Sequence, residues 1–157
     1  MGRPNFFAVA RAVFFFPQAI LVAAFPRIVA GARNAQRQAV AAVAVLGLLA
    51  TAFGSVVMVA DEASLIEGAG RLHPDMAIVD LSLARNSGLA WLHTLRHDCP
   101  DLKVIVLSVH DEQSVRDAVM RAGANAFVLK RAIATDLLRA VDAVRRDSGV
   151  EAAIHAT

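Results

Sequence analysis

Three polar residues, Asp80, Ser108 and Lys130, each follow a run of four apolar residues in this 157-residue chain. Such runs are typical of strands that are buried on both faces. In a parallel sheet the carboxyl ends of these strands lie at one edge, where open α/β sheets bind their ligands. A carboxylate, a hydroxyl and an ammonium group suit phosphoryl chemistry, with Asp80 as nucleophile, Ser108 donating to a phosphoryl oxygen and Lys130 neutralising charge. Each residue alone would be an ordinary strand end, but the three together favour a site.

Helical stretches separate these strands. Strands are expected at 56–60, 76–79, 104–107 and 126–129, and helices are expected after a capping box at 64–67, after a turn at 86–88, near Asp111, and from Thr135 to Arg146. The last helix is expected to bury Leu138, Val141 and Val144. Strands joined through helices of this length form right-handed βαβ units. The pattern therefore predicts an α/β fold with helices on both faces of a parallel sheet.

Charge divides the chain into two unequal parts. Residues 1–60 contain five arginines and no Asp or Glu, whereas all 14 acidic residues lie from Asp61 onward. The formal net charge is only +2, which argues against a protein held on nucleic acid mainly by phosphate contacts. The single cysteine, Cys99, excludes an intramolecular disulfide. We expect an atypical apolar segment over 1–54, an α/β domain over 55–148 and a tail over 149–157.

Residues 39–60 form an uncharged stretch of 22 residues, long enough to span a bilayer. Seven of them are alanine, and Gly47, Gly54 and Ser55 dilute the hydrophobicity further. The alternative is a buried helix to about Phe53, a turn, and a strand from Val56. We favour this alternative, which makes a membrane association unexpected and a cytoplasmic location the default.

Four segments of the chain resemble the receiver domain of bacterial response regulators, in the subclass that precedes LuxR-type helix-turn-helix output domains. They are HPDMAIVDLSL at 73–83, SGL at 87–89, VLSVHDE at 106–112 and RAGANAFVLK at 121–130. The resemblance implies a flavodoxin-like, doubly wound parallel sheet with strand order 2-1-3-4-5. It also implies Asp80 as phosphoacceptor, Ser108 as switch hydroxyl, Lys130 as phosphoryl-binding lysine and Phe127 as switch aromatic. The backbone carbonyl of Ser82 would be a Mg²⁺ ligand.

The first third of the chain departs from this family. Receivers carry an acidic pair after the first strand, and the window where we expect it, 28–38, holds Asn34 and arginines but no carboxylate. Hard divalent ions need charged oxygen ligands, so Mg²⁺ binding is expected to be weak or absent. The first strand and its acidic pocket are therefore expected to be degenerate, and residues 1 to about 30 poorly packed. A shifted reading frame over the first 50 or so residues would explain the departure, and genuine divergence is the alternative.

Phosphorelay signalling is the leading functional hypothesis. The domain would not be an enzyme; it would accept a phosphoryl group on Asp80 from a histidine kinase and act on an output protein. A homodimer is left open, and no direct contact with nucleic acid is expected. One alternative is a phosphorylation-independent pseudo-receiver that works as a protein-interaction module, and another is a membrane-anchored receiver. A zinc site at His93, His97 and Cys99 lacks a fourth ligand and is not expected.

Overall fold

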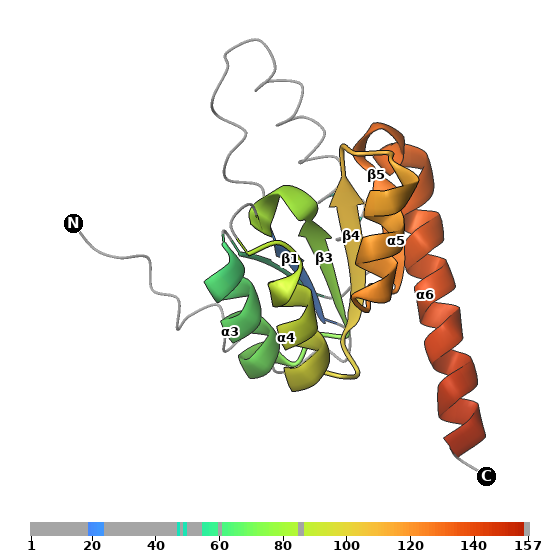
Figure 1. Cartoon of the computed structure of the whole chain (residues 1–157). Helices are drawn as coiled ribbons and strands as arrows, with labels where there is room; N and C mark the ends of the chain where they lie inside the picture. The colour runs from blue at the N-terminus through green and yellow to red at the C-terminus, as the bar shows by residue number, and fades with distance from the viewer. Residues whose placement is uncertain are drawn as a thin grey trace.

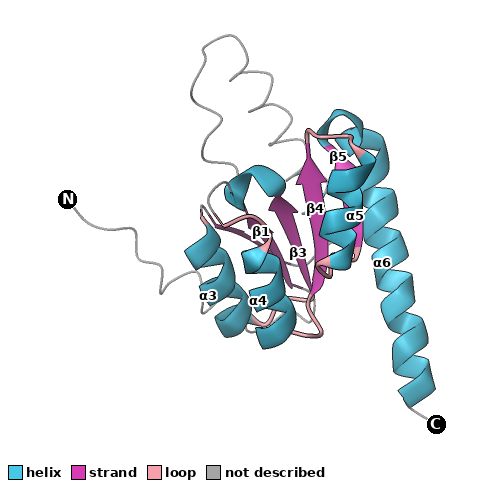
Figure 2. Ribbon diagram, in the orientation of Figure 1, coloured by secondary structure: helices cyan, strands magenta, loops and turns pink. Residues whose placement is uncertain are grey.

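The computed structural model describes residues 19–23, 47, 49, 55–59, 61–84 and 87–155. They form a five-stranded parallel sheet with flanking helices (Figures 1 and 2). The strands are β1 (Ala19–Ala23), β2 (Ser55–Val59), β3 (Met76–Asp80), β4 (Lys103–Ser108) and β5 (Ala126–Leu129). The helices are α3 (Glu62–Leu72), η2 (Leu81–Ala84), α4 (Ala90–Asp98), α5 (Gln113–Arg121), η3 (Lys130–Ala132) and α6 (Ile133–His155). The strand order β2-β1-β3-β4-β5 confirms the expected flavodoxin-like topology.

Alternate residues of the central strands enter two separate cores, one on each face of the sheet. On one face, Ala77 and Val79 of β3 pack with α3, α4 and α5, and on the other, Met76 and Ile78 pack with α6. Figure 1 shows α6 running along the side of the sheet, apart from α3 and α4. This double coverage explains why the strands are continuously apolar instead of alternating with polar residues.

The position of the first strand differs from the expectation. β1 lies at Ala19–Ala23, ahead of the 28–38 window, and pairs in parallel with both β2 and β3. The prediction that the chain is poorly packed up to about residue 30 is therefore wrong for residues 19–23. The reason is visible in the sequence, since a short β-prone run, Ile20-Leu21-Val22, stands between Pro17 and Pro26. The remaining residues of the expected N-terminal segment lie mostly outside the described part of the chain.

Two helices begin or pack differently from the prediction. α3 begins after Asp61, whose Oδ1 accepts a hydrogen bond from the Ser64 backbone N–H at 2.8 Å, so Asp61 and not Ser64 is the N-cap. This hydrogen bond lowers the pKa of Asp61 below its ordinary value. α6 begins at Ile133 and continues to His155, past the expected end at Arg146. Its fully buried leucine is Leu137, not Leu138.

The 39–60 stretch is described only in part. Leu49 is helical and fully buried in the core formed with α6. Residues 55–59 are strand β2 and pair with β1, so the end of this stretch is not helical. Within the described residues, no helix has the length and apolar character that crossing a membrane requires.

Candidate functional site

Asp80 and Lys130 meet at the carboxyl edge of the sheet, as the strand pattern predicts. Asp80 ends β3 and is 8% exposed, and Lys130 comes directly after β5. The Lys130 Nζ donates a hydrogen bond to Asp80 Oδ2 and forms an ion pair with it. The other carboxylate oxygen, Oδ1, accepts from the Ser82 backbone N–H at 2.9 Å. Both oxygens are thus held by donors, which fixes the orientation of the carboxylate.

Ser108 lies between these two residues in the sheet, at the end of β4. The register pairs Asp80 with Leu107 and Ser108 with Leu129, so the ends of β3, β4 and β5 lie side by side. Ser108 is 1% exposed, and its Oγ accepts a hydrogen bond from the His110 backbone N–H at 3.0 Å. Accepting a bond does not use the hydroxyl hydrogen, so Ser108 can still donate to an oxygen bound at this edge.

Phe127 is partly buried on β5 and packs against the core beneath α3, α4 and α5. The guanidinium carbon of Arg116, on α5, lies 4.9 Å from the centroid of the Phe127 ring. This distance is within the range of a cation–π contact. The contact links α5, the helix that follows the Ser108 loop, to the aromatic residue three positions before Lys130. Arg116 was not among the predicted site residues, although its position on a helix beside β5 follows from the fold.

The residues around Asp80 offer few charged oxygen donors to a divalent ion such as Mg²⁺. One oxygen of Asp80 faces the Lys130 ammonium, and η2 brings in Ser82 without a further carboxylate. The residues directly after β1 are Ala24 and Phe25, and no Asp or Glu occurs before Asp61. Nowhere in the described part of the chain do three or more His, Cys, Asp or Glu side chains gather as metal ligands. A hard divalent ion would find one carboxylate, a neighbouring cation and neutral oxygens.

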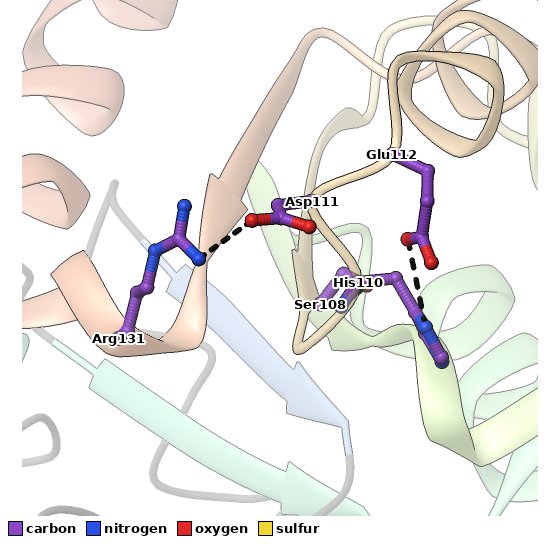
Figure 3. Close-up of polar contacts among 5 residues, drawn as sticks. All are labelled: Ser108, His110, Asp111, Glu112 and Arg131. Carbon is purple, nitrogen blue, oxygen red and sulfur yellow. Dashed lines mark hydrogen bonds and ion pairs between the residues drawn. The ribbon is translucent and has the colours of Figure 1, made fainter.

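Two polar contacts near this edge were not predicted. Asp111, in the β4–α5 loop, forms an ion pair with Arg131 of η3 at 2.6 Å, and the guanidinium lowers the pKa of the Asp111 carboxyl (Figure 3). Glu62 accepts a hydrogen bond from the Ser87 hydroxyl at 2.5 Å, which ties the start of α3 to the loop before α4. The partners of the first pair are 20 residues apart in sequence and those of the second are 25 apart. Only the sheet order brings such partners together, so no local pattern identifies them.

Comparison with known proteins agrees with this architecture. The chain matches the response regulator receiver domain over residues 33–142. The nitrate/nitrite response regulator protein NarP of Escherichia coli (strain K12) is 38% identical over 90 residues, covering 57% of this chain and 42% of NarP. The signal receiver domain of the response regulator NarL from Mycobacterium tuberculosis superposes with a TM-score of 0.59 at 25% identity, covering 82% of this chain and 96% of that domain.

A two-component response regulator of the LuxR family, from Aurantimonas sp. SI85-9A1, superposes with a TM-score of 0.63 at 20% identity and shows the same fold. This match covers 80% of this chain and 83% of that protein. The chain spans less than half of the length of the curated relatives that it matches, 36% for the transcriptional regulatory protein DegU of Brevibacillus brevis and 42% for NarP. Because the family model covers more than half of the chain, the chain belongs to the response regulator receiver domain family.

Proposed function

We propose that this domain is the receiver of a two-component phosphorelay and that Asp80 accepts a phosphoryl group from a phosphorylated histidine of a kinase. The observation that carries the proposal is the Asp80–Lys130 ion pair, formed beside Ser108 where β3, β4 and β5 end. A nucleophile, a cation and a hydroxyl donor are thereby available to one phosphoryl group. Phe127 and the loop after Ser108 would carry the signal to a partner, which is a kinase or an output protein, in the cytoplasm.

The chemistry follows from these positions. An oxygen of Asp80 attacks the phosphorus, a P–O bond forms, and the P–N bond to the donor imidazole breaks with its electron pair going to nitrogen. The product is an acyl phosphate on Asp80. Lys130 neutralises part of the added negative charge, and the Ser108 hydroxyl donates to a phosphoryl oxygen. Mg²⁺ would supply further charge neutralisation, with Asp80 and the Ser82 carbonyl as ligands, but a site with one carboxylate should hold it weakly.

The test is labelling of the full chain with acetyl phosphate, followed by intact-mass analysis over a titration of Mg²⁺. We expect one phosphoryl group per chain, added slowly and without saturation at millimolar Mg²⁺, because the ion is weakly held. Asp80→Asn should remove the label. Asp101→Asn is the matched control, since Asp101 is an exposed carboxylate just before β4, at the opposite edge of the sheet. Label that survives Asp80→Asn would contradict the proposal.

A second function, the phosphorylation-independent pseudo-receiver, is favoured by one observation. The first 60 residues contain no carboxylate, so the acidic pair that the family uses to hold Mg²⁺ is missing. In that case no label would appear at any Mg²⁺ concentration, and Asp80 would serve as a structural partner of Lys130. Binding of a partner protein would then be the same for the wild type and for Asp80→Asn.

A further inference from the structure

An ion pair connects the two loops that flank the phosphoryl site. Asp111 lies three positions after Ser108, in the loop between β4 and α5, and Arg131 directly follows Lys130 in η3. Arg131 Nη1 donates to Asp111 Oδ2 at 2.6 Å (Figure 3). Figure 3 also draws the His110–Glu112 pair, which stays within one loop.

Each partner lies next to a residue of the site. On one side, the loop is already tied to Ser108, because the His110 N–H donates to Ser108 Oγ at 3.0 Å. On the other side, Lys130 Nζ is bound to Asp80. Three hydrogen bonds, Ser108–His110, Asp111–Arg131 and Lys130–Asp80, are therefore joined by the peptide bonds His110–Asp111 and Lys130–Arg131.

We propose that Asp111 and Arg131 are positioning residues. Their ion pair holds the Ser108 loop against the Lys130 turn, so that the side chains of Ser108 and Lys130 flank one anion. The part that concerns phosphoryl binding rests on the function proposed above, whereas the positioning of the loop does not. The hydrogen bonds between β4 and β5 stop where the strands end, so they do not hold the two loops that follow. The ion pair joins these loops directly and so limits the distance between them.

The solvent exposure of the two side chains limits how much their ion pair can strengthen anion binding. The side chains of Arg131 and Asp111 are 69% and 53% exposed, so solvent and salt screen their attraction. Loss of the pair should therefore weaken anion binding by roughly two- to fivefold, without unfolding the domain. The same exposure predicts that the difference between wild type and variant shrinks in high salt.

The experiment compares Asp111→Asn, Arg131→Gln, the conservative Arg131→Lys and the charge swap that combines Asp111→Arg with Arg131→Asp, all in the full chain. The matched control is Arg71→Gln, which removes an ion pair of similar exposure on α3, away from both loops. Two quantities are measured: amide exchange of the His110 N–H by NMR, and the affinity for beryllofluoride, a tetrahedral analogue of the phosphoryl group. A melting temperature for each variant separates local from global effects.

We expect faster His110 exchange and weaker beryllofluoride binding in the two variants that remove charge, little change in Arg131→Lys and in the control, and recovery in the charge swap. Unchanged His110 exchange in both charge-removing variants would overturn the proposal, as would a charge swap whose His110 exchange is as fast as in those two variants. If wild type binds no beryllofluoride, the function proposed above fails, and His110 exchange alone decides whether the ion pair positions the loop.

Discussion

Gly123 is the residue whose replacement tests the packing of this fold most directly. It follows α5 with a φ of +106°, a conformation that residues with a side chain rarely adopt. A Cβ at this position would lie 2.6 Å from Cγ and 2.8 Å from Cδ of Arg96, on α4. Arg96 cannot move away freely, because its guanidinium donates to the backbone carbonyls of Pro100 and Leu102. Gly123→Ala therefore introduces both backbone strain and an overlap.

The expected magnitude is the sum of these two effects. Placing an alanine at a strongly positive φ costs about 1 kcal/mol, and overpacking against a partly buried side chain costs a further ~1–3 kcal/mol. We therefore expect Gly123→Ala to lower the free energy of unfolding by about 2–4 kcal/mol, measured by urea denaturation. Replacing Arg96 by alanine removes the overlapping atoms, so in that background Gly123→Ala should cost only about 1 kcal/mol.

Two other glycines provide matched controls. Gly88 has a φ of +60° but open space around its Cβ position, so Gly88→Ala should show only the backbone cost of about 1 kcal/mol. Gly70 is in α3 with open space and no positive φ, so Gly70→Ala should stabilise the domain by up to ~1 kcal/mol. An equal cost of Gly123→Ala with and without the Arg96 side chain would refute the role of the overlap.

Two further predictions concern α3 and α5. Removing the N-cap of α3 with Asp61→Ala should lower the free energy of unfolding by about 1 kcal/mol at pH 7. Because the pKa of Asp61 is lowered in the folded state, the charged cap contributes in full above the ordinary value of 3.8, and the difference from wild type should shrink as the pH falls through the folded pKa. A difference that stays the same from pH 7 down to acid unfolding would contradict this. Arg116→Met keeps an unbranched apolar side chain but removes the guanidinium above Phe127, so the ring should flip faster in aromatic NMR spectra while the free energy of unfolding falls by no more than about 1 kcal/mol; an unchanged flip rate would show that the guanidinium does not hold the ring.

The central strands and their polar ends were predictable because each combines two signals. Four consecutive apolar residues indicate a strand covered on both faces, and a single polar residue at the end of each run marks the carboxyl edge. Asp80, Ser108 and Lys130 meet both conditions, and their strand ends lie side by side at one edge as expected. The flavodoxin-like strand order came from the family resemblance.

The ends of helices and the first strand were less predictable. Gly149 looks like a stop signal for α6, yet the helix continues to His155, since one glycine costs only about 1 kcal/mol and good helix formers follow it. β1 is a run of five apolar residues inside a longer apolar stretch, where periodicity does not separate strand from helix. The Asp111–Arg131 pair could not be predicted, because exposed charges have many alternative partners of similar energy.

The charges around Asp80 bear directly on the phosphoryl transfer proposed for this site. The ion pair of Asp80 and Lys130 has no net charge. The two carboxylates that the family uses to hold Mg²⁺, and that this chain lacks, would carry a negative charge equal in size to the positive charge of the ion. Without the two carboxylates and without the Mg²⁺, the net charge of the site is therefore the same as with all of them. A phosphoryl group carries about −1.5 to −2 at neutral pH, so in either case its charge must be balanced locally. If Asp80 is phosphorylated as proposed and no metal ion is tightly held, Lys130 would have to move from the carboxylate to the phosphoryl oxygens, where it would supply the nearest positive charge.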